Sequence, residues 1–140
     1  MKIQYHAEDT DFLPSNQDEL SEWVSAVIKS HDYILEEINY IFCSDEYLLE
    51  INKEHLLHDY FTDIITFDNS DEENIIESDI FISVDRVKDN STTQGVPFER
   101  ELNRVMIHGI LHLLGFGDKT EAEKNLMREK EDACLSLLKN

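Results

Sequence analysis

The stretch that decides the fold lies at residues 108–118, which read His-Gly-Ile-Leu-His-Leu-Leu-Gly-Phe-Gly-Asp. His108 and His112 are four residues apart, and on an α-helix this spacing directs both rings to one face, where they can share an ion. Gly115 is expected to end the helix, and the Phe-Gly pair after it lets the chain turn back. Asp118 can then offer a carboxylate to the same point. Two imidazoles and a carboxylate, with a fourth position left to water, are an established donor set for catalytic zinc.

Two histidines on an apolar helix are by themselves more often packed or exposed side chains than metal ligands. The Gly-x-x-Asp continuation to Asp118 favours the metal site. Gly109 supports it, because glycine inside a helix costs about 1 kcal/mol relative to alanine and usually marks the close approach of another element. Gly109 also occupies the place where His-Glu-x-x-His peptidases carry their general base, which makes a metallopeptidase-like hydrolase the weaker alternative.

Outward from this helix, apolar periodicity predicts alternating helices and strands. We expect strands over residues 2–6, 34–43, 64–67 and 79–84, and helices over residues 15–30, 45–57, 85–89, 97–114 and 120–138. The strand at 64–67 is expected to be central, and residues 68–74 and 90–95 are expected to be polar loops. The alternation predicts one α+β domain over residues 1–140, with helices packed on a small mixed sheet of about four strands. The metal site would lie on a central helix and the turn after it.

Capping residues predict where the helices begin. Ser15 and Ser44 are expected to be N-caps, and Thr120 with Glu123 forms the pattern of a capping box. Pro97 is favourable at a first helical position. On the last helix, the side chains expected to face the core are Leu126, Met127, Ala133, Cys134, Leu137 and Leu138.

The composition is that of an ordinary globular protein. The chain has 140 residues, of which 41% are hydrophobic and 31% charged. No apolar run approaches the roughly 20 residues of a membrane helix, and the N-terminus lacks the apolar stretch of a signal peptide. Cys43 and Cys134 are far apart and are expected to be buried thiols. We therefore expect a cytoplasmic protein.

The negative charge is unevenly distributed. The net charge is −19, yet residues 1–85 hold 3 of the 12 basic and 22 of the 31 acidic residues. Residues 86–140, which include the motif, hold 9 of each. A distant acidic surface is largely screened beyond about 8 Å at physiological salt. The charge therefore weakens the case for a polyanionic substrate without excluding it.

The motif resembles the signature of the YbeY family of bacterial endoribonucleases, His-Gly-x-Leu-His-Leu-x-Gly-Tyr-Asp-His. Asn52 and the Thr-Asp-Ile-Ile-Thr-Phe of residues 62–67 resemble the family's Asn…Thr-Asp-Val-Leu-Ser-Phe block. The Asp-Ile-Phe-Ile-Ser of residues 79–83 resembles its Gly-Asp-Ile-x-Ile strand, with Ser78 in place of the glycine. Further matches are Glu101, Leu102, Met127 and Glu131, so that the resemblance spans residues 48–138.

The resemblance implies a cytoplasmic, zinc-dependent endoribonuclease with one zinc per chain. Its substrate would be single-stranded RNA, its role the maturation of the 16S rRNA 3′ end and ribosome quality control, and its partner the small ribosomal subunit. Neither a membrane nor DNA is expected as a partner. A ribosome-assembly factor with weakened or no catalysis is the main alternative.

Two departures from the family pattern affect the site. Asp118 stands where the family has its third histidine, which lowers the formal charge of an ion with its ligands by one unit. Leu56 stands where the family has an arginine, a residue type that stabilises the charge of a phosphodiester transition state.

Three other residues are candidates for roles around the metal. Arg104, one helical turn before His108, is the best substitute for the missing arginine, and its alternative is a solvated pair with Glu101. His58 is a weaker candidate. Asp63 is a candidate for orienting a zinc-bound imidazole, and its alternative is a capping role.

Overall fold

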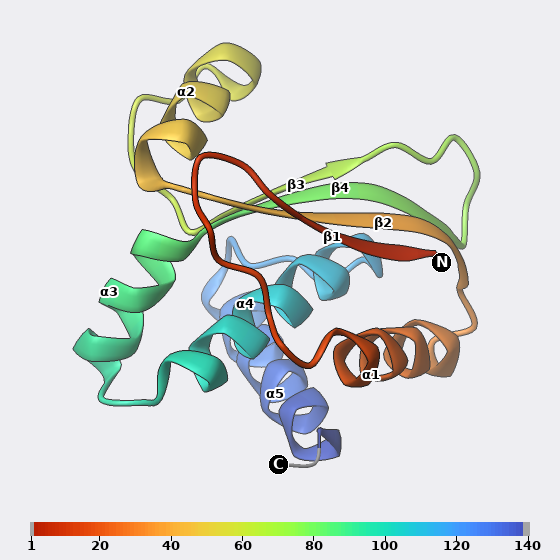
Figure 1. The fold of residues 1–140 in the computed structure, drawn as a ribbon. Helices are drawn as coiled ribbons and strands as arrows, with labels where there is room; N and C mark the ends of the chain where they lie inside the picture. Colours follow the sequence, from red (N-terminus) through yellow and green to blue (C-terminus); the bar gives the residue numbers. More distant parts are fainter. Residues whose placement is uncertain (1, 139–140) are drawn as a thin grey trace.

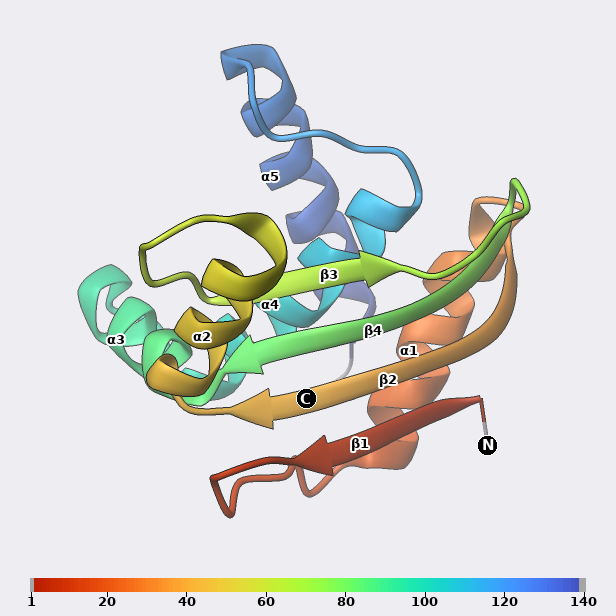
Figure 2. The same ribbon diagram turned by 90° about the horizontal axis from the view of Figure 1, so that it is seen from above.

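A four-stranded mixed sheet forms the middle layer of the molecule in the computed structural model, which describes residues 2–138 (Figure 1). The strands are β1 (Ile3–Ala7), β2 (Ile34–Cys43), β3 (Ile64–Asp68) and β4 (Ile75–Ser83). Their order is β1-β2-β4-β3, as Figure 2 shows from above. β1, β2 and β4 are parallel, and β3 is antiparallel to β4. The predicted α+β class and strand number are confirmed.

The position predicted for the strand at 64–67 is wrong, because β3 is an edge strand. Its apolar residues have another explanation: both of its faces are covered. Ile65 packs with Cys43 and Leu48 on the α2 side, and Ile64 packs against the main core on the other side. An edge strand covered on both faces has the same apolar composition as a central one.

The helices lie on both faces of the sheet. They are α1 (Gln17–Ser30), α2 (Asp45–Leu56), α3 (Val84–Gln94), α4 (Phe98–Leu113) and α5 (Glu121–Leu137). In Figure 1, α1, α4 and α5 lie below the sheet and α2 above it. The larger core cluster joins the sheet to α1, α4 and α5, so α4 is central, as expected. None of the described helices is long and apolar enough to cross a membrane.

Gly109 allows α4 to approach the sheet closely. A Cβ at this position would lie 3.0 Å from both Ile64 Cδ1 and Thr66 Oγ1. The close approach expected from the sequence is therefore confirmed, and the neighbouring element is β3. At the other end of the motif, Gly115 adopts a φ of 104° just after the C-cap Leu114, and this confirms the predicted stop.

Several predicted helix starts are confirmed and others need correction. The Ser44 cap and the Thr120–Glu123 capping box are present. α1 begins at Gln17, two residues later than the predicted range, and its N-cap is Asn16 rather than Ser15. Pro97 is the N-cap of α4 rather than its first residue.

α3 extends through the segment predicted as a polar loop at 90–95. Ser83 caps its start by accepting a hydrogen bond from Arg86 N, and Gly95 ends it with a φ of 69°. Ser91 is buried, and its hydroxyl donates a hydrogen bond to the backbone carbonyl of Lys88. The polar side chains are thus satisfied locally, which their composition alone does not reveal.

The buried stripe of α5 differs from the one expected. Met127 and Cys134 are buried, and both Cys43 and Cys134 are free thiols, as predicted. Leu126, Ala133 and Leu137 are instead exposed, and Leu138 is half-buried. The buried residues recur at Met127, Glu131, Cys134 and Leu135, a helical stripe that contains a glutamate.

Candidate metal centre

A cleft of about 710 Å³ opens where the end of α4 meets β3 and the segment between α2 and β3. His108, His112 and Asp118 line it, together with Asp63. The motif residues therefore share one cavity with a residue that lies 45 positions earlier in the chain than His108.

His108, His112 and Asp118 form a group that can hold a metal ion. Their ligand atoms all lie within 4.8 Å of one another. Asp118 Oδ2 is 3.4 Å from His108 Nε2 and 3.3 Å from His112 Nε2. Among residues 2–138 these are the side chains that bring three metal donors together.

These separations fit a tetrahedral ion. Donor atoms about 2.0–2.2 Å from a tetrahedral zinc lie about 3.3–3.6 Å from one another. Both distances from Asp118 Oδ2 fall within that range. Asp118 replaces the expected third histidine without leaving the coordination position, so the donor set fits a small divalent ion.

A buried glutamate fixes the orientation of His108. Glu131 Oε2 lies 2.6 Å from His108 Nδ1, and Glu131 is 2% exposed. Burial opposes the charge of this carboxyl, but the hydrogen bond from His108 and the charge of Arg104 outweigh it and lower the pKa of Glu131. The lowered pKa of Glu131 favours its carboxylate form, to which Nδ1–H of His108 donates, and Nε2 is the ring nitrogen that faces Asp118.

Arg104 lies behind the metal donors and is held by two buried carboxylates. Its Nε and Nη2 donate to Glu101, and its Nη1 donates to Glu131 Oε1 over 3.2 Å. Burial disfavours the guanidinium charge, but these hydrogen bonds and the two negative charges outweigh burial and raise the pKa of Arg104. Arg104 is not among the residues that line the cleft. Its geometry matches the alternative left open above, a pair with Glu101, although the pair is buried rather than solvated.

Asp63 lies in the cleft but not behind an imidazole. Its carboxylate accepts a hydrogen bond from Asn90 Nδ2 at 3.4 Å, and its backbone carbonyl accepts one from Ser83 N. Burial raises the pKa of Asp63, and the charges of Arg104 and His108 partly oppose this shift. The orienting role suggested for Asp63 is the one that Glu131 occupies for His108.

Glu131 is the residue in contact with a candidate metal donor that the sequence did not single out. The resemblance marked it only as a match, and no spacing rule connects it to His108, because the two lie on different helices. The sequence feature that could have indicated Glu131 is the presence of a glutamate among the buried positions of α5. A buried carboxylate requires a charged or hydrogen-bonded partner, so this position could have been singled out.

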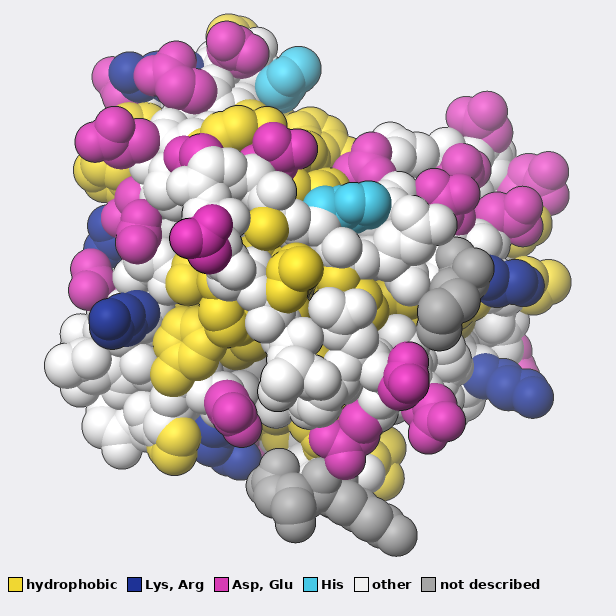
Figure 3. All heavy atoms as spheres, viewed as in Figure 1, with side chains coloured by type: hydrophobic (Ala, Val, Ile, Leu, Met, Phe, Trp, Pro, Cys, Tyr) yellow, Lys and Arg dark blue, Asp and Glu magenta, His cyan; other side chains and the backbone are white. Residues whose placement is uncertain are grey.

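The cleft carries little positive charge. Lys119 is the one Lys or Arg among the described residues that line it. Leu56, at the place where the resemblance expects an arginine, also lines the cleft and is 41% exposed. Figure 3 shows acidic side chains over the α2 end and the β3–β4 hairpin end of one face of the molecule. Because Asp63, Asp68 and Asp118 line the cleft together with this single lysine, its electrostatic attraction for a polyanion is weak.

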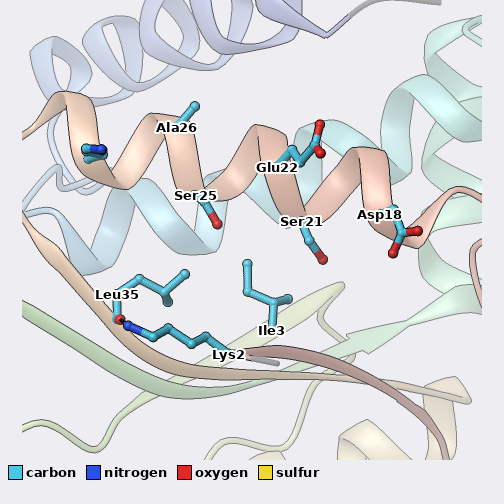
Figure 4. A pocket seen from close by; sticks show the side chains of 9 residues that line it. Lys2, Ile3, Asp18, Ser21, Glu22, Ser25, Ala26 and Leu35 are labelled. Atoms are coloured by element: carbon cyan, nitrogen blue, oxygen red, sulfur yellow. Dashed lines mark hydrogen bonds between the residues drawn. The ribbon is translucent and has the colours of Figure 1, made fainter.

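A second hollow of about 670 Å³ lies on the other side of the fold, between α1 and the neighbouring strands (Figure 4). Ser21 and Ser25 project into it from α1, and Lys2 donates to Leu35 O across 3.1 Å on the strand side. None of the described residues lining it is a histidine or a cysteine. The metal donors lie in the cleft by α4 instead.

The fold and the site define an α+β protein in which two histidines of the central helix and a carboxylate after it form a group that can hold a metal ion. The family model described as "Endoribonuclease YbeY" matches residues 3–139, and the chain belongs to this family. The resemblance inferred from the motif is thereby confirmed.

Several relatives cover nearly the whole chain. The chain is 53% identical over 137 residues to "Endoribonuclease YbeY" of Cytophaga hutchinsonii, covering 98% of this chain and 96% of that protein. It is 50% identical over 129 residues to the protein of the same description from Flavobacterium johnsoniae, covering 92% of each. The solution structure of TM1509 from Thermotoga maritima superposes with a TM-score of 0.66 at 27% identity, covering 96% of this chain and 87% of that one.

Proposed function

We propose that the chain is a zinc-dependent endoribonuclease that hydrolyses single-stranded RNA. The observation that carries the proposal is the His108–His112–Asp118 group, in which Asp118 Oδ2 lies at tetrahedral spacing from both imidazoles, in a chain of the YbeY family. The relatives named "Endoribonuclease YbeY" support the reaction class. The family resemblance further supports action in the cytoplasm on the small ribosomal subunit, in 16S rRNA 3′-end maturation and ribosome quality control.

The roles of the residues follow from their positions. A divalent ion bound by the three donors would act as a Lewis acid toward water and a phosphodiester oxygen. Glu131 holds His108 in the tautomer that offers Nε2 to the site. Asp63, whose pKa is raised by burial, lies in the same cleft and is our candidate for receiving a proton from the attacking water.

Two residues supply positive charge near the proposed metal site. Arg104 neutralises the two glutamates beside it, and through Glu131 it influences His108. Lys119 lines the cleft and is the cation able to meet a substrate phosphate there. Direct contact of Arg104 with a transition state stays a prediction, and its pairing with Glu101 favours the neutralising role.

Metal analysis of purified protein tests the proposal. We expect about one zinc per chain and loss of it in His112→Ala, because two donors bind zinc far less tightly than three. His6→Ala is the matched control, since His6 lies on β1 at the opposite edge of the sheet. Normal zinc content in His112→Ala would contradict the site.

A cleavage assay tests the activity. Metal-loaded protein should cut a short single-stranded RNA, and a chelator or the His108→Ala substitution should stop the cutting. Cleavage that is equal in His108→Ala would indicate a contaminating nuclease. Full metal binding without RNA cleavage would favour the assembly-factor alternative, to which Leu56 in place of the expected arginine lends support.

A further inference from the structure

The segment between α2 and β3 displays aromatic rings on the wall of the metal cleft. His58 and Tyr60 both line the cleft that contains His108 and His112. Tyr60 is 56% exposed, although aromatic rings are normally used to fill cores. An aromatic ring kept in solvent at the edge of a reaction site is available for a ligand.

The two rings are already stacked on each other. Their centroids are 5.1 Å apart and their planes differ by 20°. The Tyr60 hydroxyl lies 2.9 Å from His58 Nδ1, so a hydrogen bond locks the pair in this geometry. A planar ligand can therefore add one more ring to the stack without first ordering two free side chains.

A buried asparagine holds the segment in place. Asn52 is 1% exposed, and its side-chain Nδ2 donates to the backbone carbonyl of Tyr60 over 2.9 Å. The backbone carbonyl of Asn52 accepts a hydrogen bond from His58 N. Leu57 closes α2 in the left-handed region with a φ of 58°, which turns the chain toward the cleft. Arg86 lies over the Phe61 ring at 5.3 Å and fixes the far end of the segment. Contacts with α2 and α3 thus hold the segment that carries the aromatic pair.

The neighbouring side chains form an exposed apolar patch. Leu57 is 88% exposed, Phe61 49% and Leu56 41%. Contiguous exposed apolar residues beside a cleft mark binding surfaces in proteins. A patch of this kind can bind a protein partner or nucleobases. The charge of the cleft indicates whether RNA would be held there through its phosphates or through its bases.

Phosphate contacts cannot dominate RNA binding at this cleft. Lys119 is the one cation among its described lining residues, and the chain carries a net charge of −19. Proteins that hold single strands combine a basic groove with aromatic stacking. With the basic part nearly absent, affinity for a strand must come mainly from stacking.

We propose that His58 and Tyr60 form a stacking platform for one nucleobase of an RNA strand whose phosphodiester lies at the His108–His112–Asp118 centre. The inference rests on the proposed function, because the RNA substrate brings the base to the platform. The platform assigns a binding role to exposed aromatic residues that the metal chemistry does not use.

The test measures binding without cleavage. Chelator-treated protein is titrated into a short fluorescent single-stranded RNA, and into the same strand with its central bases removed. Tyr60→Leu keeps an apolar side chain but loses the ring, and Tyr60→Phe keeps the ring. Leu126→Ala is the control, because Leu126 is an exposed apolar residue on α5, outside the cleft.

We expect Tyr60→Leu to weaken RNA binding roughly ten-fold and Leu126→Ala to stay within about two-fold of the unmodified protein. Tyr60→Phe should fall between them, because it keeps the ring but loses the hydrogen bond to His58. Removing the bases should weaken binding to the unmodified protein by a similar factor and have little further effect on Tyr60→Leu. We also expect a shallow salt dependence of binding, because few phosphates are neutralised. Equal affinities of Tyr60→Leu and the unmodified protein would overturn the platform, as would the absence of RNA binding.

Two further measurements separate this proposal from the function on which it rests. RNA cleavage by metal-loaded protein with binding indifferent to Tyr60 would overturn the platform and leave the nuclease standing. Base-dependent binding without cleavage would support the platform and contradict the nuclease function. Sedimentation of the unmodified protein and Tyr60→Leu checks the apolar patch: self-association that depends on Tyr60 would identify a second copy as its occupant and overturn the platform.

Discussion

The orientation of His108 depends on one carboxylate from another helix. Glu131 reaches His108 Nδ1 from α5, while its second oxygen accepts from Arg104. The glutamate therefore connects the ring that faces the ion to a buried charge network. Its negative charge also makes the imidazole a stronger donor to a cation.

Replacing Glu131 with Gln should weaken metal binding roughly 10- to 100-fold, because the neutral amide no longer strengthens or fixes the imidazole. Glutamine has nearly the same size, so the fold should be retained. Zinc affinity is measured by competition with a chromophoric chelator, and circular dichroism monitors the fold. Glu129→Gln, an exposed change on the same helix, should leave zinc affinity unchanged. A Glu131→Gln protein with unaltered zinc affinity would remove Glu131 from the site.

Arg104 makes a second prediction at the scale of the residue. Its side chain is 15% exposed and lies between Glu101 and Glu131, whose side chains are 1% and 2% exposed. Arg104→Met would leave the buried carboxylate of Glu101 without its cation and remove one of the partners of Glu131, so the free energy of unfolding should fall by about 3–5 kcal/mol. Urea denaturation of metal-free protein measures this change.

Arg128→Met is the matched control, because Arg128 is 54% exposed and lies 3.6 Å from the same Glu131 oxygen. An exposed ion pair should contribute less than about 1 kcal/mol. Adding Glu101→Gln to Arg104→Met should recover part of the lost stability, since it removes the buried charge that Arg104 no longer neutralises. Equal effects of Arg104→Met and Arg128→Met would show that the buried network contributes no more than a surface pair.

The grouping of the three candidate metal donors could be predicted from the sequence because His108 and His112 share one helix and Asp118 follows at a short distance. The supporting contacts could not, because they join α4 to α5 and depend on how the helices pack. Asp63 was correctly expected near the site, but local spacing cannot distinguish a residue lining the cleft from one behind an imidazole. The residues that tune a site are set by tertiary packing.

At the scale of the element, α5 begins with a complete capping box. Thr120 Oγ1 accepts from Glu123 N, and Glu123 Oε1 accepts from the backbone N–H groups of Thr120 and Lys119. Thr120→Ala removes one of these bonds and should lower the free energy of unfolding by about 1 kcal/mol. Denaturant titration at neutral pH measures the change.

The pH dependence of this cap has a definite sign. The backbone N–H groups of Thr120 and Lys119 hold the pKa of Glu123 below its ordinary value of 4.5. The contribution of Glu123 is therefore complete above pH 4.5 and is lost as the pH falls through the lowered pKa. The stability difference between the unmodified protein and Glu123→Ala should shrink below that pH, whereas Glu129→Ala should differ little at any pH. A difference that grows on acidification would contradict the cap.

Elements with local signals were predicted well, and those set by covering layers were not. β2 and the start of α2 follow from β-branched residues and from Ser44. β3 is apolar although it is an edge strand, because α2 and α4 cover its two faces, and a local window of sequence does not contain that information. The buried stripe predicted for α5 is wrong because the prediction used hydrophobic residues alone, whereas one of the buried positions is a glutamate.

At the scale of the whole molecule, the charge imbalance opposes folding. A net charge of −19 on 140 residues produces self-repulsion in the compact state. The excess lies in residues 1–85, which supply all four strands of the sheet, α1 and α2. Residues 86–140, which carry the metal donors, are balanced, so the site lies on the nearly neutral part of the chain.

Salt should therefore stabilise this protein. Raising the salt concentration from about 0.01 M to about 0.15 M shortens the screening length from about 30 Å to about 8 Å, which weakens repulsion between exposed carboxylates. The buried Arg104 network is screened much less. We expect the thermal midpoint of the metal-free protein to rise over this range, as calorimetry at fixed pH would show.

A variant of the β3–β4 connection isolates the cause. Asp71, Glu72 and Glu73 are exposed there, and changing them to Asn, Gln and Gln removes three charges without disturbing a buried contact. The triple variant should be more stable than the unmodified protein at low salt and gain less from added salt, because less repulsion remains to be screened. Its zinc affinity should be unchanged, since the ligands lie on α4 and the turn after it. An equal gain from salt in both proteins would mean that general salt effects, rather than the acidic surface, control stability.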